Sequence, residues 1–121
     1  RVIQHKVDSI LSIHPHAYVV VMGDMNSNPQ DDIRGMINMM MNWDGVGYGT
    51  QKHQGTWSFL DQFYVSSALR SKASAHIFSP EWLLEEDEKY LGYRPKRTFI
   101  GFRYHAGYSD HLPIVLRLDM Q

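Results

Sequence analysis

The sequence has no cysteine among its 121 residues, almost no excess charge of either sign, and no long apolar run. The absence of cysteine excludes disulfides, thiolate nucleophiles and cysteine-ligated zinc sites. The longest apolar stretch, Ala17 to Met22, is far shorter than the roughly 20 residues that cross a bilayer, so we expect no membrane span. A formal net charge of −1 gives no electrostatic indication of a general nucleic-acid binder.

The composition is that of a globular domain, with 43% hydrophobic and 21% charged residues. The chain opens at Arg1 and runs directly into a helical pattern, so we expect it to be part of a longer protein. Apolar residues at i, i+4, i+7 and i+8 define one helix face: Ile3, Val7, Ile10 and Leu11. We expect this helix to end near Ile13, because Pro15 disfavours helical geometry at the residue before it.

The rest of the chain shows strand patterns and one further helical pattern. Ala17 to Met22 is a β-branched run typical of a strand covered on both faces. A second helix is predicted from Asp31 to Asn42, with its apolar face at Ile33, Met36, Ile37, Met40 and Met41. Gly45 to Gly55 is read as a loop, and strands are predicted at Trp57 to Ser66, Ala75 to Phe78 and Leu112 to Leu118. A helix followed by a buried strand indicates a layered α/β architecture.

A polar loop, Gly23 to Pro29, follows the first predicted strand. Ligands of layered sheets gather at the carboxyl ends of strands, so Asp24 and Asn26 are well placed for a site. An Asx-rich turn that caps the next helix explains the same residues, and both interpretations stay open.

Asp61 lies within an apolar strand pattern. Period-two alternation puts it on the same face as Phe59 and Phe63, where a lone carboxylate is costly without a partner. A histidine or a metal ion would be a suitable partner, whereas a bulge that turns Asp61 outward is the alternative.

A third polar cluster, Ser109-Asp110-His111, has the residue types of a hydrolase triad. Adjacent residues on an extended segment point to opposite sides, so these three are not expected to act on one another. His111 also stands where a nucleophile elbow requires glycine, which argues against a serine hydrolase.

Together, Gly23-Asp24-Met25-Asn26, Leu60-Asp61-Gln62 and Ser109-Asp110-His111-Leu112-Pro113 resemble the last three motifs of the endonuclease/exonuclease/phosphatase superfamily, which has the DNase I-like fold. The stretch from Leu83 to Gly107 further resembles a bacterial, Bacteroides-like branch. The resemblance implies a four-layer α/β (α+β) sandwich. Residues 1–121 would form the C-terminal half of one domain, with one mixed sheet and outer helices.

The resemblance also implies residue roles. Asp24 would orient or deprotonate the attacking water, and Asn26 would hydrogen-bond the phosphate or that water. His111 would face the scissile phosphate, with Asp61 fixing its tautomer and favouring its protonated form. Asp110 would help to hold Mg²⁺, or Mn²⁺ in its place.

The sequence departs from the family pattern in two ways. The principal metal-binding Glu belongs to the N-terminal half, and no Glu of this chain stands in a matching context. Gln62 occupies a position where many relatives have His or Tyr.

A basic stretch precedes the last motif and is a candidate substrate-binding loop: Arg94, Lys96 and Arg97. Charge pairing with the acidic run from Glu85 to Glu88 is an equally good explanation, and that run is otherwise expected to be a solvent-facing loop.

The resulting hypothesis is a metal-dependent phosphoesterase that hydrolyses a phosphodiester or phosphomonoester by in-line attack of an activated water. The alternative is a noncatalytic interaction module, or an inactive fragment, on the same scaffold. We expect this piece alone to be nearly inactive. We also expect its sheet to contact an N-terminal half or a second copy, because large bare apolar faces are rare on monomers.

Overall fold

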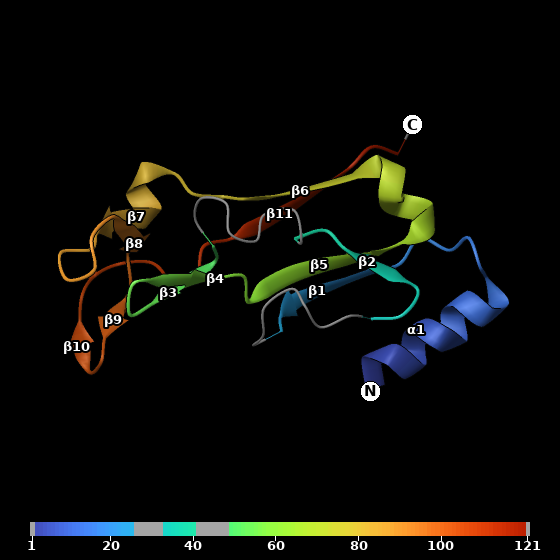
Figure 1. Ribbon diagram of the computed structural model, residues 1–121, viewed down its shortest axis with the longest axis horizontal. Coiled ribbons are helices and arrows are strands. Elements are labelled where there is room, and N and C mark those ends of the chain that lie inside the picture. The colour runs from blue at the N-terminus through green and yellow to red at the C-terminus, as the bar shows by residue number, and fades with distance from the viewer. Residues whose placement is uncertain (1, 26–32, 41–48, 121) are drawn as a thin grey trace.

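The computed structural model describes residues 2–25, 33–40 and 49–120, which form an elongated, strand-rich α+β structure (Figure 1). The α-helix of the described residues lies at one end, and short two-stranded ladders lie at the other. The elements in chain order are α1 (Val2–Ile13), β1 (Val20–Asp24), β2 (Met36–Asn38), β3 (Gln51–His53), β4 (Thr56–Ser58), β5 (Asp61–Ser66), the 3₁₀ helix η2 (Ser67–Lys72), β6 (Ala73–Ile77), the 3₁₀ helix η3 (Glu81–Leu83), β7 (Leu84–Glu86), β8 (Tyr93–Pro95), β9 (Phe99–Ile100), β10 (Arg103–Tyr104) and β11 (Ile114–Leu118). The α+β class agrees with the sequence prediction.

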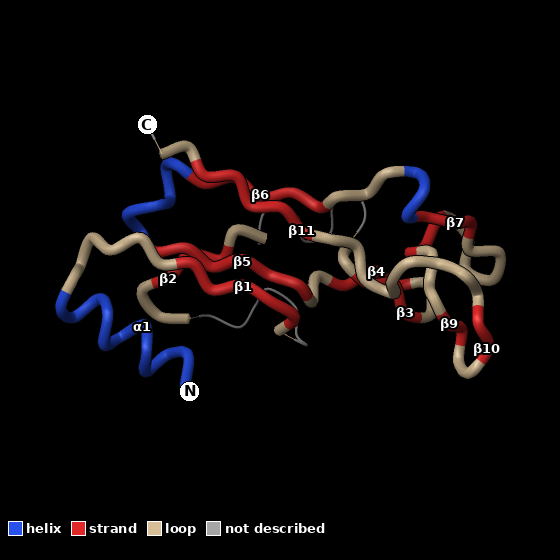
Figure 2. Tube along the Cα trace, turned by 180° about the vertical axis from the view of Figure 1, so that it is seen from behind, coloured by secondary structure: helices blue, strands red, loops and turns tan. Residues whose placement is uncertain are grey.

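Helix α1 forms where the apolar spacing predicts it and ends at Ile13, as expected from Pro15. The amide of His14 still donates to the carbonyl of Ile10 at 2.8 Å, and the helix stops there. Val7 is its buried residue, and α1 runs alongside β1 and β2 (Figures 1 and 2). Within the described residues, no helix is long and apolar enough to cross a membrane.

Strand β5 is the centre of the three-stranded sheet and pairs antiparallel with β1 on one side and β2 on the other. Its residues Phe63, Tyr64 and Val65 are buried. The register pairs Asp24 with Asp61, so the last residue of β1 lies opposite the first residue of β5. The sheet therefore brings these two carboxylates to one of its edges.

Strand β1 is shorter and more exposed than the sequence predicts. It spans Val20–Asp24 rather than Ala17 to Met22, and β5 is its only strand neighbour among the described residues. Met22 is 69% exposed, so the expected cover on both faces is wrong for the described chain. The β-branched run gives strand propensity, but it does not determine what packs on the strand.

The predicted helix from Asp31 to Asn42 is wrong in its described part, residues 33–40. Strand β2 forms there and pairs with β5. Gly35 takes a φ of +82°, outside the helical range, and the ladder with β5 then satisfies the backbone of β2. The remaining residues of the predicted helix lie outside the described residues: Asp31, Asp32, Met41 and Asn42.

The hydrophobic core lies between the β5 sheet and a second antiparallel ladder made of β6 and β11. These two strands confirm the predicted strands near Ala75 and Leu112, and Figure 2 shows them side by side next to β5. The core consists of buried residues from both layers and the segment after β2: Met40, Phe59, Phe63 and Ala75. Packing of β11 on this core fixes the chain just after His111.

The described strands form small antiparallel sheets rather than the single mixed sheet expected. The predicted strand from Trp57 to Ser66 is interrupted at residues 59–60, and part of the predicted glycine-rich loop forms the β3–β4 hairpin. Gly49 permits the close approach of this hairpin, because a Cβ there would lie 2.4 Å from the carbonyl oxygen of Ser58.

A buried ion pair ties β3 to the β7–β8 ladder. The Lys52 Nζ lies 3.0 Å from Asp87 Oδ2 and also donates to the carbonyls of Leu91 and Tyr93. The exposed fractions of the Lys52 and Asp87 side chains are only 5% and 4%. Burial acts to raise the pKa of Asp87, but the Tyr90 amide and Lys52 outweigh it, and the pKa is lowered.

We predict that Met40→Ala destabilises the protein more than Met36→Ala. Met40 is fully buried in the core, and truncation of such a residue costs roughly 2–5 kcal/mol, whereas Met36 is only half-buried. The free energy of unfolding in urea measures both. Met120→Ala, at an exposed position, is the control and is expected to have little effect. Equal losses at Met36 and Met40 would contradict this description of the core.

Candidate active site

The site is built from three segments that are far apart in the chain. Asp24 ends β1, Asp61 begins β5, and His111 lies just before β11, where it forms a β-bridge with Gln51 of β3. Antiparallel pairing of β1 with β5 aligns the two carboxylates, and the bridge to β3 brings the histidine to the same edge. The topology therefore makes one cluster from three separate motifs.

The side chains of Asp24, Asp61 and His111 converge, with one ligand atom from each lying within 4.8 Å of the others. His111 Nδ1 lies 2.6 Å from Asp61 Oδ2, which is a short hydrogen bond. Asp61 and His111 are half-buried and Asp24 is exposed. The partner of Asp61 is therefore the histidine, and the structure brings Asp24, Asp61 and His111 together.

Electrostatics at this cluster favour the protonated imidazole. Burial of His111 acts to lower its pKa, but the hydrogen bond to Asp61 and the charges of Asp61, Asp110 and Asp24 outweigh burial. The pKa of His111 is consequently raised above its ordinary value of 6.5. A cationic imidazole at an open edge is suited to an anionic ligand such as a phosphate.

Ser109 and Asp110 flank the cluster but do not form a hydrolase triad with His111. The Ser109 Oγ accepts a hydrogen bond from the backbone N–H of His111 at 3.1 Å, whereas the ring Nδ1 is bonded to Asp61. Asp110 Oδ2 lies 4.0 Å from His111 Nε2, and its side chain is largely exposed. The carboxylate of Asp110 therefore lies beside the cluster, with most of its side chain in contact with solvent.

Thr50 is a buried residue that the sequence pattern did not single out. Its Oγ1 accepts hydrogen bonds from the amides of Leu60 and Asp61, at 3.0 and 3.3 Å. Its carbonyl accepts from the amide of Leu112 at 2.7 Å. One threonine therefore positions both the start of β5 and the segment that carries His111. A lone threonine in a glycine-rich stretch gives no sequence signal for this role.

Gln62, the residue at which the sequence departs from the expected motif, has its side chain buried in the fold. It is fully buried, and its amide donates to the Phe59 carbonyl at 2.8 Å. Its Oε1 accepts from Asn38 and from the Tyr64 hydroxyl. The departure at this position therefore concerns core hydrogen bonding rather than His111.

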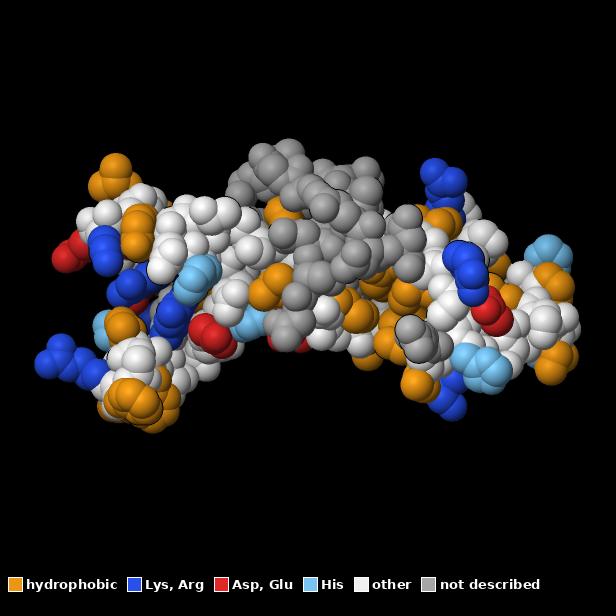
Figure 3. Space-filling model, turned by 60° about the horizontal axis from the view of Figure 1, so that its bottom comes forward, with side chains coloured by type: hydrophobic (Ala, Val, Ile, Leu, Met, Phe, Trp, Pro, Cys, Tyr) orange, Lys and Arg blue, Asp and Glu red, His pale blue; other side chains and the backbone are white. Residues whose placement is uncertain are grey.

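The basic candidates are largely engaged in the fold. Arg94 Nε lies 2.8 Å from Glu85 Oε2, which is the charge pairing that the sequence left open. The Arg97 Nη2 donates to the Lys52 carbonyl at 2.6 Å, and its buried Nε has no hydrogen-bond partner among the described residues. Lys96 contributes through its backbone, because its carbonyl accepts from the amides of Tyr108 and Ser109. Several Lys and Arg side chains are visible over the β7–β10 end (Figure 3).

The acidic run is not the uniformly solvent-facing loop that the sequence predicts. Glu85 is half-buried and bonded to both Arg94 and His105, the latter at 2.7 Å. Burial acts to raise the pKa of Glu85, but these partners outweigh it and the pKa is lowered. Asp87 is in the buried pair with Lys52, whereas Glu86 and Glu88 are exposed. Asn26, the remaining candidate, lies outside the described residues.

An α+β fold with a histidine–carboxylate cluster at one sheet edge agrees with the class of hydrolases that have a DNase I-like fold. More specifically, the chain belongs to the Endonuclease/Exonuclease/phosphatase family, whose family model matches residues 1–120. No curated protein and no solved structure matches the sequence.

We predict that Asp61→Asn lowers the pKa of His111. The burial that lowers this pKa remains in the variant, whereas the negative charge of Asp61 and its hydrogen bond, which raise the pKa, are lost or weakened. In the unsubstituted protein, the raised pKa of His111 stabilises the folded state. This contribution is complete below the ordinary pKa of 6.5 and is lost as the pH rises through the raised pKa of the folded protein. The stability advantage of the unsubstituted protein should therefore shrink above pH 6.5. NMR titration of His111 in chelator and urea unfolding across pH measure the two effects, and an unchanged titration would contradict them.

We predict that Thr50→Val disturbs the site, whereas Thr50→Ser preserves it. Valine has a similar shape but leaves the amides of Leu60 and Asp61 without their acceptor, at a cost of about 1–3 kcal/mol. Serine keeps the acceptor oxygen and is the matched control. Urea unfolding gives the stability, and the His111 titration shows whether the Asp61 hydrogen bond is retained. Equal behaviour of the two variants would refute the positioning role of Thr50.

Proposed function

We propose that this chain supplies catalytic residues of a metal-dependent phosphoesterase that acts by in-line attack of water on phosphorus. The family relationship supports a phosphoesterase or nuclease-like class. The observation that carries the proposal is the 2.6 Å bond between His111 Nδ1 and Asp61 Oδ2, with Asp24 in the same cluster. Such a cluster combines a cationic donor for a phosphate with a carboxylate able to take a proton from water.

In this proposal each residue has one task. His111 is held in one orientation by Asp61, which also favours its protonated form, and its Nε2 side presents a proton and positive charge to a phosphate oxygen. The exposed Asp24 carboxylate orients the attacking water and accepts its proton. Asn26 hydrogen-bonds the phosphate or that water, as the family pattern implies.

The donor set fits a hard divalent cation such as Mg²⁺ or Mn²⁺. Asp61 and His111 use their nearest atoms on each other, whereas Asp110 and Asp24 present carboxylates beside them. Carboxylate oxygens are the ligands that such cations prefer, and cysteine ligands are absent from the sequence. We therefore assign Asp110 to help hold the metal, together with a Glu outside this chain. A bound metal would polarise the phosphate and neutralise charge that develops on it.

We further propose that the chain is the C-terminal half of its domain. Several large apolar side chains are exposed over α1 and β1: Val2, Ile3, Ile10, Ile13 and Met22. An N-terminal half, or a second copy of the chain, would remove them from water. The same half would supply the metal-binding Glu.

We predict that Asp24→Ala, His111→Ala and Asp110→Ala each reduce turnover at least about 10²-fold in the full-length protein. The assay is hydrolysis of a nitrophenyl phosphodiester with Mg²⁺, with a chelator control that should abolish it. Stability should change little for the exposed Asp24 and Asp110. Tyr18→Ala, at an exposed position before β1, is the control for turnover.

Two outcomes would contradict this proposal. Turnover of the full-length protein that persists in the His111→Ala and Asp24→Ala variants would place the chemistry elsewhere. A full-length protein without turnover on phosphodiesters and phosphomonoesters would favour a noncatalytic module. We expect the 121-residue chain alone to be nearly inactive, and turnover by it that is lost in Asp110→Ala would overturn the half-domain proposal.

A further inference from the structure

A basic pocket of about 250 Å³ lies between the turn of the β3–β4 hairpin and the loop that joins β7 to β8. Figure 3 shows Lys and Arg side chains gathered at this end of the molecule. The pocket is lined by five basic residues and one carboxylate: Lys52, His53, Lys89, Arg94, Arg97 and Asp87. Although the chain as a whole has a net charge of −1, this lining therefore carries an excess of positive charge.

The carboxylate of the pocket lining is already neutralised within the fold. Asp87 Oδ2 lies 3.0 Å from Lys52 Nζ, and its Oδ1 accepts a hydrogen bond from the Tyr90 amide at 3.1 Å. The same Lys52 Nζ donates to the carbonyls of Leu91 and Tyr93, so the three N–H donors of its ammonium group all have acceptors. This buried pair therefore builds the wall of the pocket, and other cations are left to meet a ligand.

Arg97 and Lys89 are cations of the lining that form no ion pair with any carboxylate of the described residues. The Arg97 Nη2 donates to the Lys52 carbonyl at 2.6 Å, but its buried Nε has no hydrogen-bond partner in the described part of the chain. A buried donor is costly unless water or a ligand supplies an acceptor. Lys89 is exposed, and its Nζ lies 5.3 Å from the centre of the Tyr90 ring. The pocket thus offers two positive charges to an anion.

The two walls of the pocket are packed against each other. Gly55, in the β3–β4 turn, has a φ of +85° and lies so close to the β7–β8 loop that a Cβ there would come within 2.9 Å of Tyr90 Cβ. On the β8 side, Arg94 Nε is fixed by Glu85 Oε2 at 2.8 Å. The pocket is therefore formed before a ligand arrives, which reduces the entropy lost on binding.

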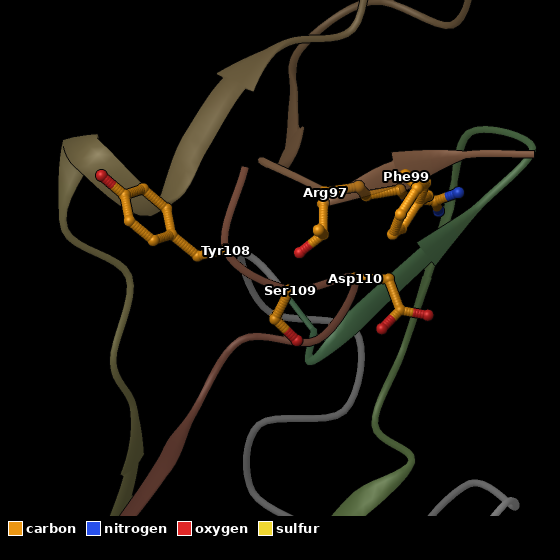
Figure 4. Close-up of a pocket in the computed structure, with 6 residues that line it drawn as sticks. Arg97, Phe99, Tyr108, Ser109 and Asp110 are labelled. Atoms are coloured by element: carbon orange, nitrogen blue, oxygen red, sulfur yellow. The ribbon is translucent and has the colours of Figure 1, made fainter. Parts of the chain in front are cut away.

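Arg97 separates the basic pocket from the His111 cluster. It also lines a cavity of about 380 Å³ together with Ser109 and Asp110, and Figure 4 shows its side chain running from that cavity toward the β3–β4 hairpin. Asp110 Oδ2 lies 4.0 Å from His111 Nε2, so that cavity belongs to the cluster. Among the described residues, Arg97 is the one residue that lines both. The basic pocket is thus a neighbouring site with its own set of side chains.

From these observations we propose that the basic pocket binds the phosphate group of a small soluble molecule, at a site separate from the His111 cluster. Arg97 supplies a guanidinium and Lys89 a flexible ammonium group, and both groups recognise phosphate oxygens. A phosphate dianion matches two unpaired positive charges, whereas a carboxylate matches one. This binding site goes beyond the proposed phosphoesterase function and does not depend on it.

The surroundings of the pocket favour a small ligand over a polymer or a membrane. Glu86 and Glu88 are exposed and adjoin Asp87 and Lys89 in the chain. A nucleic-acid backbone or an anionic lipid surface carries many negative charges and would meet these carboxylates, whereas a single phosphate group is small enough to enter the pocket alone.

The test is a titration of the metal-free, full-length protein with inorganic phosphate at constant ionic strength. NMR of the Tyr90 amide and the Arg97 Nε–H reports on the pocket itself, and the same titration of His111→Ala removes the contribution of the cluster. We expect both resonances to shift, with equal phosphate affinity in the two proteins. Sulfate, another tetrahedral dianion, should bind comparably, and acetate should bind at least about tenfold more weakly.

The matched substitutions are Lys89→Gln in the pocket and Lys6→Gln on α1, at the other end of the molecule (Figure 1). Both lysines are exposed, so both variants should fold. Lys89→Gln should weaken the phosphate affinity about tenfold, because a charge-assisted hydrogen bond is lost, and Lys6→Gln should leave it within about twofold. Arg97→Gln, with its fold checked by circular dichroism, should weaken the affinity in the same direction.

Several results would overturn this assignment. Acetate that binds as tightly as phosphate would show that the pocket does not select a dianion. Unchanged affinity in Lys89→Gln, or loss of the pocket shifts in His111→Ala, would place phosphate elsewhere. A larger response to a single-stranded oligonucleotide, or to vesicles of equimolar phosphatidic acid and phosphatidylcholine, would replace the small ligand with a polymer or a membrane.

Discussion

The antiparallel register of β1 and β5 is the constraint on which the site depends, because it sets Asp24 opposite Asp61. A shift of one residue would turn one carboxylate to the other face of the sheet, since side chains alternate along a strand. Thr50 holds the start of β5, and with it Asp61, through its bonds to the Leu60 and Asp61 amides. Its carbonyl also holds Leu112, and thereby the residue before it, His111. Backbone pairing and one buried hydroxyl thus assemble the cluster before any ligand binds.

The electrostatics of the cluster follow from that assembly. Three carboxylates surround one imidazole, and their combined charge outweighs the burial that would otherwise favour neutral histidine. An anionic ligand with a divalent cation would enter a site that already contains both signs of charge. This arrangement suits phosphoester hydrolysis, in which the protein must orient water and stabilise charge rather than form a covalent bond.

At the β7–β10 end, some basic residues stabilise the fold through ion pairs. Lys52 pairs with Asp87, and Glu85 binds both Arg94 and His105. Arg94, one of the three candidate substrate-binding residues, therefore stabilises the fold through its pair with Glu85. Arg97 also donates inward, to the Lys52 carbonyl, and lines the cavity that includes Asp110.

The sequence by itself predicted α1, β6 and β11, because local apolar spacing and Pro15 act on neighbouring residues. It also singled out Asp24, Asp61 and His111 as candidate site residues, since charged and titratable side chains are conspicuous at the end of a strand or within an apolar pattern. Only the tertiary structure decided that residues 36–38 form a strand. Their apolar residues have the spacing of a helix face, but hydrogen bonding to β5 outweighs that local preference. Only tertiary structure likewise revealed Thr50 and the Lys52–Asp87 pair, because their partners lie 10 or more residues away and sequence spacing does not encode such contacts.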